Sequence, residues 1–240
     1  IEGRLGNIIT GKGYSEFSDY LDYVFSEKGT DEMVNMVNKL TTNHTFFMRE
    51  SSHFDFFRQT VLPYLKNSKN NYDLRLWSAG CSSGEEAYTL AMIIDDFFSG
   101  STEPWEKTML ATDISTIMLN KAEDGIYEQS SVLKMPKSFQ TKYFQPYGNG
   151  QFKVVQSIRQ KIVFKKFNLM TEIFPFKKKF DVIFCRNVMI YFDKETKDAL
   201  LKKFFNSIED GGYLFIGQAE SITRSSTGFT YVMPSIYRKV

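Results

Sequence analysis

Residues 74–91, LRLWSAGCSSGEEAYTLA, decide the fold class of this chain. The apolar run Leu74–Ala79 predicts a short buried strand, Gly80–Gly84 a tight turn, and the periodic apolar residues of Glu85–Phe98 a helix. Further strand-like runs alternate with helical segments along the rest of the chain, at Thr108–Thr112, Lys161–Phe167, Phe180–Cys185 and Tyr213–Gly217. This alternation predicts an α/β fold with a doubly wound parallel sheet.

Two stretches fall outside the alternation. Residues 1–62 carry apolar side chains at helical spacing, so we expect a small all-helical N-terminal domain there. A linker over residues 63–73 then leads into the α/β domain of residues 74–240. The gap between Gly125 and Gln160 is too long for an ordinary helix–strand connection. We therefore expect an inserted antiparallel β-subdomain at about residues 125–160.

Composition excludes several classes of protein. The 240 residues include 30 Lys+Arg against 28 Asp+Glu and are 42% hydrophobic, too balanced and too apolar for a disordered chain. Two cysteines cannot form a disulfide framework, and His44 and His53 lack metal-ligand spacing, so we expect no metal. No apolar run is long enough to cross a membrane and no signal peptide opens the sequence, which makes a soluble cytoplasmic protein the expectation.

The turn after the first strand lies where open α/β sheets bind ligands, and Gly80 allows the backbone to approach one closely. Two carboxylates, Glu85 and Glu86, follow Gly84 where a phosphate-binding loop would carry a lysine. They would repel a pyrophosphate but suit a cationic or zwitterionic ligand, and the sulfonium and ammonium of S-adenosylmethionine fit that charge. The alternative is that both carboxylates only complement the helix dipole.

Three further segments carry candidate site residues. Asp113 ends the second strand, where an acid can accept both ribose hydroxyls of an adenosine or can cap the next helix. In Thr41–Glu50, Thr45 and Arg49 are four residues apart and can share one helix face. Cys185–Phe192 follows the fourth strand without the Pro-Pro of adenine amino-methyltransferases, which disfavours methylation of a nucleobase.

Taken together, these segments resemble the chemotaxis receptor methyltransferase (CheR) family over nearly the whole chain. The segments that carry the resemblance occur in the family's order: residues 41–50, 78–88, 111–115, 185–193 and 217–221. The resemblance implies a Rossmann-like class I methyltransferase sheet with a small helical N-terminal domain and an inserted antiparallel β-subdomain. It also implies transfer of a methyl group from S-adenosylmethionine to glutamate side chains of chemoreceptors. The products would be glutamyl γ-methyl esters and S-adenosylhomocysteine.

The resemblance assigns roles residue by residue. Arg49 and Tyr191 become the catalytic candidates that hold the substrate carboxylate near the sulfonium, since a guanidinium can pair with a carboxylate bidentately. The cofactor-binding candidates are Asn43, Thr45, Arg49, Ala79, Gly80, Glu85, Asp113, Asn168, Leu169 and Asn187. The implied partners are the cytoplasmic domains of chemoreceptors, with no nucleic acid, no membrane insertion and a monomeric enzyme.

Two alternatives stay open on the residues alone. Residues 134–179 contain 11 Lys+Arg and one acid, Glu172, a net charge of +10 that leaves −8 for the rest of the chain. Such a basic stretch is compatible with an RNA 2′-O-methyltransferase, which predicts salt-sensitive RNA binding. It could equally steer an acidic receptor. The second alternative is a non-catalytic adaptor that binds S-adenosylmethionine without turnover.

Overall fold

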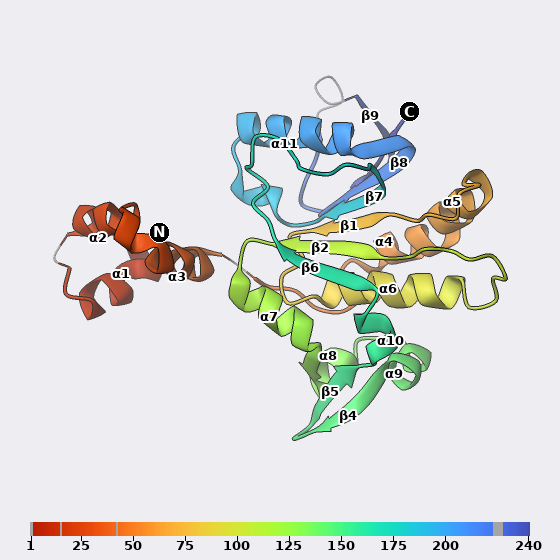
Figure 1. Cartoon of the computed structure of the whole chain (residues 1–240), viewed down its shortest axis with the longest axis horizontal. Helices are drawn as coiled ribbons and strands as arrows, with labels where there is room; N and C mark the ends of the chain where they lie inside the picture. Colours follow the sequence, from red (N-terminus) through yellow and green to blue (C-terminus); the bar gives the residue numbers. More distant parts are fainter. Residues whose placement is uncertain (1, 15, 42, 223–227) are drawn as a thin grey trace.

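The structure, a computed structural model, describes residues 2–14, 16–41, 43–222 and 228–240 (Figure 1). Within the described residues, the main sheet has seven strands in the order β6-β2-β1-β7-β8-β10-β9. The strands are β1 (Leu76–Ala79), β2 (Met109–Asp113), β6 (Ile162–Lys166), β7 (Phe180–Cys185), β8 (Ile208–Ile216), β9 (Phe229–Met233) and β10 (Ile236–Lys239).

The first five strands of that order pair in parallel, and β10 and β9 close the sheet as an antiparallel hairpin. Strands β1 and β7 are buried at every position, because helices cover both faces of the sheet centre. This arrangement confirms the predicted α/β fold. It also brings the carboxyl ends of β1, β2 and β7 to the same edge of the sheet.

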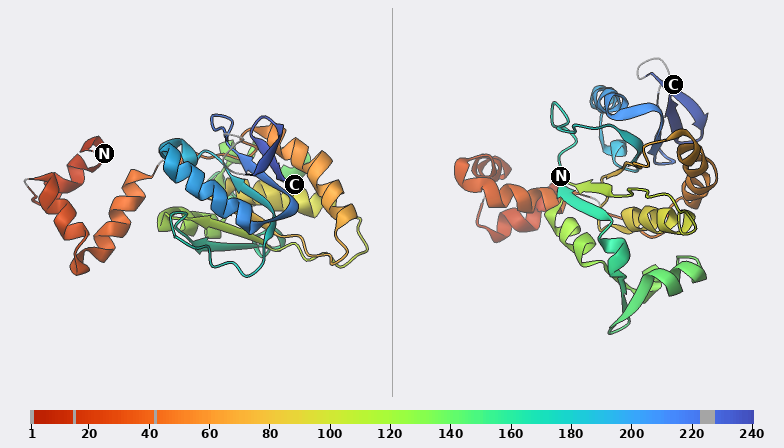
Figure 2. Two further views of the ribbon diagram at one scale, coloured as in Figure 1. Left: turned by 90° about the horizontal axis from the view of Figure 1, so that it is seen from above. Right: turned by 45° about the vertical axis from the view of Figure 1, so that its right-hand side comes forward.

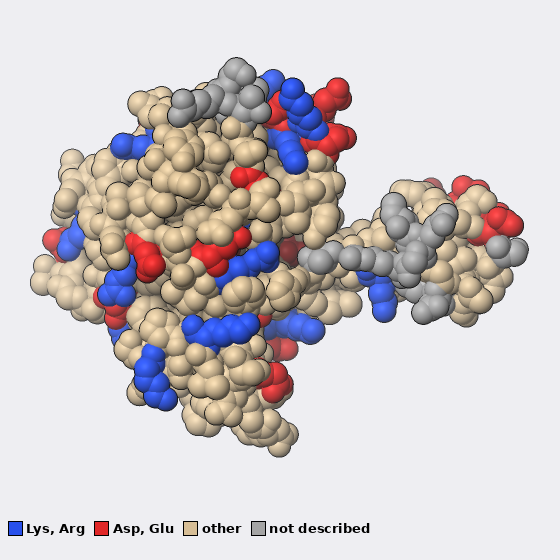
Figure 3. All heavy atoms as spheres, turned by 180° about the vertical axis from the view of Figure 1, so that it is seen from behind, with Lys and Arg blue, Asp and Glu red and all other residues tan. Residues whose placement is uncertain are grey.

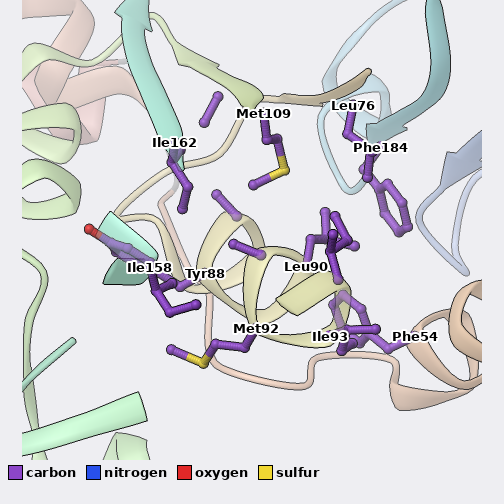
Figure 4. Close-up of a cluster of buried hydrophobic side chains, with 14 of the residues drawn as sticks. Phe54, Leu76, Tyr88, Leu90, Met92, Ile93, Met109, Ile158, Ile162 and Phe184 are labelled. Atoms are coloured by element: carbon purple, nitrogen blue, oxygen red, sulfur yellow. The ribbon is translucent and has the colours of Figure 1, made fainter. Parts of the chain in front are cut away.

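Each face of the sheet has its own core. On one face, α6 (Glu85–Phe97) packs between the strands and neighbouring helices, as the labelled side chains of Figure 4 show. On the other, α11 (Lys194–Ser207) packs around Trp77, a fully buried residue whose ring contacts Phe176 at 4.8 Å between centroids and Phe204 at 5.5 Å. The Trp77 Nε1–H donates to Thr112 Oγ1 at 2.9 Å, which ties β1 to β2.

The helical segment before β1 packs into the first of these cores, on the same face of the sheet as α6. Helices α4 (Ser51–Phe56), η2 (Phe57–Val61) and α5 (Leu62–Ser68) follow one another without a break, and their apolar residues join the cluster beneath β7 and β8. Pro63 lies in the first turn of α5, where a missing N–H is tolerated. We expected the helical region to end at residue 62 and a linker to cover residues 63–73. Residues 63–68 are instead helical and continue the run that packs on the sheet.

A separate group of helices precedes residue 41. Helices α1 (Glu2–Gly11), α2 (Phe17–Val24), η1 (Glu27–Gly29) and α3 (Thr30–Leu40) stand apart from the sheet in both Figures 1 and 2. They share a small core of Leu5, Tyr20, Val24 and Met36. The end of α3 meets the main domain at α7 (Thr116–Asp124), where Asn38 accepts a hydrogen bond from Ser115 Oγ at 2.7 Å.

The insertion after α7 is the expected antiparallel β-subdomain. Strands β3 (Ile126–Glu128), β4 (Phe144–Gly148) and β5 (Gln151–Val154) form a sheet in the order β3-β5-β4. The short helices α8 (Gln129–Val132), α9 (Lys137–Tyr143) and α10 (Gln156–Arg159) flank it. Tyr143 Oη donates to Asp95 Oδ2 at 2.9 Å and so attaches the subdomain to α6. In the described part of the chain, no helix is both long and apolar enough to span a bilayer.

Candidate functional site

A cavity of about 390 Å³ lies at the carboxyl ends of β1, β2 and β7. Its volume falls in the range of roughly 300–1,000 Å³ typical of small-molecule and cofactor sites. Apart from Ala79 and Glu85, every residue predicted for the site lines this cavity: Asn43, Thr45, Arg49, Gly80, Asp113, Asn168, Leu169, Asn187 and Tyr191. The topology of the sheet thus brings together residues almost 150 positions apart in the sequence.

The turn after β1 forms the floor of the cavity. Gly80 has a φ of +85°, and a Cβ there would lie 2.5 Å from Val188 Cγ2, so only glycine fits without displacement. The backbone N–H groups of Gly80 and Cys81 both donate to the Thr112 carbonyl, at 2.7 and 2.9 Å. The turn is therefore anchored to β2 and close to the loop that follows β7.

Asp113 is buried at the end of β2, and backbone groups fix its carboxylate. Oδ2 accepts from the N–H of Ser82 at 2.8 Å, and Oδ1 accepts from the N–H of Ser115 at 2.9 Å. Burial raises the pKa of Asp113, and these backbone hydrogen bonds oppose that rise. An ionised carboxylate has about four acceptor positions. An oriented Asp113 can therefore still accept hydrogen bonds from two hydroxyl groups of a ligand.

Of the two carboxylates after Gly84, the one that lines the cavity is Glu86, not the predicted Glu85. Glu85 accepts from Ser83 Oγ at 2.7 Å, outside the cavity wall. Glu86 accepts from Ser78 Oγ at 2.7 Å and from Arg186 Nη1 at 3.1 Å. Successive helix residues point about 100° apart, so the two side chains of such a pair face different directions. Ala79, also predicted, is buried in β1 and is not part of the wall.

Sequence reasoning did not find Arg186 and Glu50. The buried Arg186 guanidinium lies between Glu86 and Glu50, whose Oε2 accepts from Nη2 at 3.0 Å and from Nε at 3.3 Å. Burial works to raise the pKa of Glu50, but the charge and hydrogen bonds of Arg186 outweigh it and lower that pKa. For the more deeply buried Glu86, burial prevails and the pKa is raised.

Glu220, likewise missed, holds the loop between β7 and the short helix η3 (Met189–Tyr191). Its carboxylate accepts the backbone N–H of Asn187 at 3.0 Å, of Ile190 at 3.1 Å and of Gly217 at 2.6 Å. The same loop presents Tyr191, whose side chain is 61% exposed at the edge of the cavity. In the sequence, Glu220 lies just after the fifth parallel strand, within the segment 217–221 that contributes to the family resemblance.

The charges around the cavity favour a cationic ligand. Asp113 and Glu86 both line the cavity, and Glu86 is paired there with the buried guanidinium of Arg186. The Arg49 side chain is partly exposed, and its Nη1 donates to the carbonyl of His44 at 2.7 Å. The deep part of the cavity therefore carries excess acid, and the edge carries a guanidinium.

Comparison with known proteins gives the family. The family description "CheR methyltransferase, SAM binding domain" matches residues 43–237. The chain belongs to the CheR methyltransferase family. It is 42% identical to the chemotaxis protein methyltransferase of Borreliella burgdorferi, over 100% of this chain and 85% of that protein. It is 32% identical to the chemotaxis protein methyltransferase of Escherichia coli, over 99% of this chain and 81% of that protein.

This CheR-family chain is therefore an S-adenosylmethionine-dependent methyltransferase with a Rossmann-like sheet. Among solved structures, a glycopeptide N-methyltransferase complexed with S-adenosylmethionine is similar over 66% of this chain and 53% of its own, at 12% identity and a TM-score of 0.37. That likeness is too remote to bear on the substrate. The residues that the structure describes hold no group of three or more His, Cys, Asp or Glu side chains that could bind a metal ion.

Proposed function

We propose that this chain methylates glutamate side chains of chemoreceptors, which forms glutamyl γ-methyl esters and S-adenosylhomocysteine. The observation that carries the proposal is the division of charge in the cavity, with Asp113 and Glu86 inside and Arg49 at the edge. A cationic donor suits the interior and an anionic acceptor suits the edge. The relatives described as chemotaxis protein methyltransferases support a chemoreceptor as the partner.

The cofactor would lie across the ends of β1 and β2. Asp113 has the acceptor capacity for the ribose hydroxyls, and Gly80 allows close approach of the backbone. Asn168 shapes the wall beside Leu169, because its Oδ1 accepts from the N–H of Met170 at 2.9 Å. When bound, S-adenosylmethionine supplies an electrophilic methyl group on a sulfonium. The ionised form of Glu86 would stabilise that positive charge.

The acceptor would enter beside Arg49 and Tyr191. A glutamate side chain is already ionised near neutral pH, so its oxygen needs alignment rather than a general base. The Arg49 guanidinium has five N–H donors, and the hydrogen bond to His44 uses one of them. The remaining donors can hold a carboxylate, and Tyr191, which lines the same cavity, would contact that carboxylate from the side.

The experiment is incubation of the purified chain with methyl-tritiated S-adenosylmethionine and membranes that contain chemoreceptors. We expect protein-bound label that alkali releases as methanol, at normal rates for the surface control Asp210→Asn and much reduced rates for Arg49→Ala. Label in RNA would support the 2′-O-methyltransferase alternative. Tight cofactor binding without label in any acceptor would support the adaptor. Normal receptor methylation by Arg49→Ala would contradict the role of Arg49.

The basic stretch of residues 134–179 is partly neutralised in the fold. Lys161 pairs with Asp95 and Lys178 with Asp73, and Arg159 is held by a hydrogen bond to the backbone carbonyl of Glu123 at 2.9 Å. Lys and Arg lie in separate groups on the face that Figure 3 presents, several of them beside acidic side chains. Lys153 lies 5.1 Å from the ring of Tyr147, on the β-subdomain. Lys153 is therefore a better test of receptor steering than Arg159 or Lys161, which help to hold the subdomain.

A further inference from the structure

Arg49 lies in a strained turn. Both of its neighbours, Met48 and Glu50, have positive φ values, of 61° and 56°. Residues other than glycine seldom adopt this conformation, and they keep it only where surrounding contacts impose it. The turn also starts helix α4, and no side chain caps that helix at Glu50. Some contact outside the turn must therefore hold the backbone that presents Arg49 to the cavity.

Arg186, which directly follows β7, makes those contacts. Its Nη2 donates both to the backbone carbonyl of Arg49 and to the Glu50 carboxylate, and its Nε donates to the same carboxylate. With the bond from Nη1 to Glu86, four hydrogen bonds bind Arg186 within the protein, against the five donors of a guanidinium. Its side chain is only 2% exposed. Arg186 is thus placed to fix the turn rather than to bind the acceptor.

Glu50 extends the same contacts to two other loops of the site. Its Oε1 accepts from Asn187 Nδ2 at 3.3 Å, in the loop after β7. Its Oε2 accepts from the backbone N–H of Gln218 at 3.3 Å, in the loop after β8. One carboxylate therefore joins the turn of Arg49 to both loops that follow the central strands.

We propose that Glu50 and Arg186 are positioning residues for methyl transfer, which hold Arg49 in register with the acceptor carboxylate. The inference rests on the proposed function, because it takes Arg49 as the residue that meets the acceptor. A positioning role differs from a purely structural role in one measurable respect. A residue that acts through Arg49 loses its effect on the rate once Arg49 is removed, whereas a scaffold residue keeps it.

The test is a double-mutant cycle of Glu50→Gln and Arg49→Ala, with Asp210→Asn as an acid-to-amide control on the surface. Initial rates of receptor methylation give kcat and KM, and calorimetry gives the affinity for S-adenosylmethionine. We expect Glu50→Gln to lower kcat roughly 10- to 100-fold, the size of effect that a misplacement of about 1 Å produces. Cofactor affinity should stay within about 3-fold, and Glu50→Gln should add no loss to Arg49→Ala.

A second measurement uses no receptor. Amide hydrogen exchange over residues 46–53 should accelerate at least about 10-fold in Glu50→Gln and in Arg186→Lys, since a lysine cannot reproduce the planar fork. It should not change in the β-subdomain. Where Arg49→Ala is too slow to assay, faster exchange confined to the turn, together with unchanged cofactor affinity and a lowered kcat in Glu50→Gln, supports the inference.

Several results would overturn the inference. Equal loss of rate from Glu50→Gln in both backgrounds would make Glu50 a scaffold residue, as would loss of cofactor binding together with the rate. Unchanged rate or unchanged exchange in Glu50→Gln would show that Glu50 does not hold the turn of Arg49. By contrast, a wild-type chain that forms no alkali-labile ester, or an Arg49→Ala variant with normal rates, would contradict the proposed function itself.

Discussion

Replacing Gly80 with alanine tests how tightly the floor of the cavity is built. The new Cβ would lie 2.5 Å from Val188 Cγ2, well inside van der Waals contact. A left-handed conformation costs an L-residue about 1–2 kcal/mol, and overpacking adds about 1–3 kcal/mol. The hydrogen bonds from Gly80 and Cys81 to the Thr112 carbonyl oppose any backbone shift that would relieve the contact. We therefore expect Gly80→Ala to lower the free energy of unfolding by roughly 2–5 kcal/mol.

The two parts of that effect can be separated. Val188→Ala removes the atom that clashes, so the double variant should recover the steric part, about 1–3 kcal/mol, and keep the backbone part. Urea unfolding followed by circular dichroism gives the four free energies of the cycle. Calorimetry should also find weaker binding of S-adenosylmethionine by Gly80→Ala, since both residues line the cavity. Additivity within about 0.5 kcal/mol would refute the predicted contact between Gly80 and Val188.

Three further predictions follow from buried polar contacts. Asp113→Asn should weaken S-adenosylmethionine binding roughly 10- to 100-fold, because a charged acceptor contributes about 1.5–3 kcal/mol, and calorimetry with unchanged affinity would contradict this. Burial and the nearby Arg186 lower the pKa of His53 to about 4. Between pH 6.5 and pH 4, His53 therefore binds a proton in the unfolded chain but stays neutral in the folded chain. Stability should fall by up to about 3 kcal/mol between pH 6.5 and pH 4, and His53→Gln should flatten that slope in urea titrations. Tyr143→Phe should cost about 0.5–1.5 kcal/mol in thermal unfolding through its lost bond to Asp95, and no change would mean that this bond does not attach the subdomain.

Local patterns in the sequence were enough for the central part of the fold. A strand, a glycine turn and an amphipathic helix are each set by residues within one window, so their order along the chain predicts the sheet. Because parallel strands end at one edge of a sheet, the polar residues just after them could be placed together in advance. Gly80 and Asp113 were found in this way, whereas Asn187 came from the resemblance to the CheR family, and all three line the cavity.

Contacts between distant residues could not be read from such windows. The apolar spacing of residues 51–62 predicts a helix in any context, but only the packed core shows that the helical run continues to Ser68 and belongs beneath β7 and β8. The ion pair between Glu50 and Arg186 joins residues 136 positions apart, and nothing near either one indicates its partner. Such pairs depend on how the elements pack, which the period of a single helix or strand does not specify.

By itself, the sequence determined the chemistry available to this protein: the order of its elements, the acids at its strand ends, and its resemblance to the CheR family. The tertiary structure decided which of those groups act together. It turned Glu86 rather than Glu85 toward the cavity and enclosed Arg186 between two carboxylates. The physical reason is that the direction of a side chain follows from the rotation of its helix and the packing around it. A charge becomes influential only where burial removes the water that would screen it.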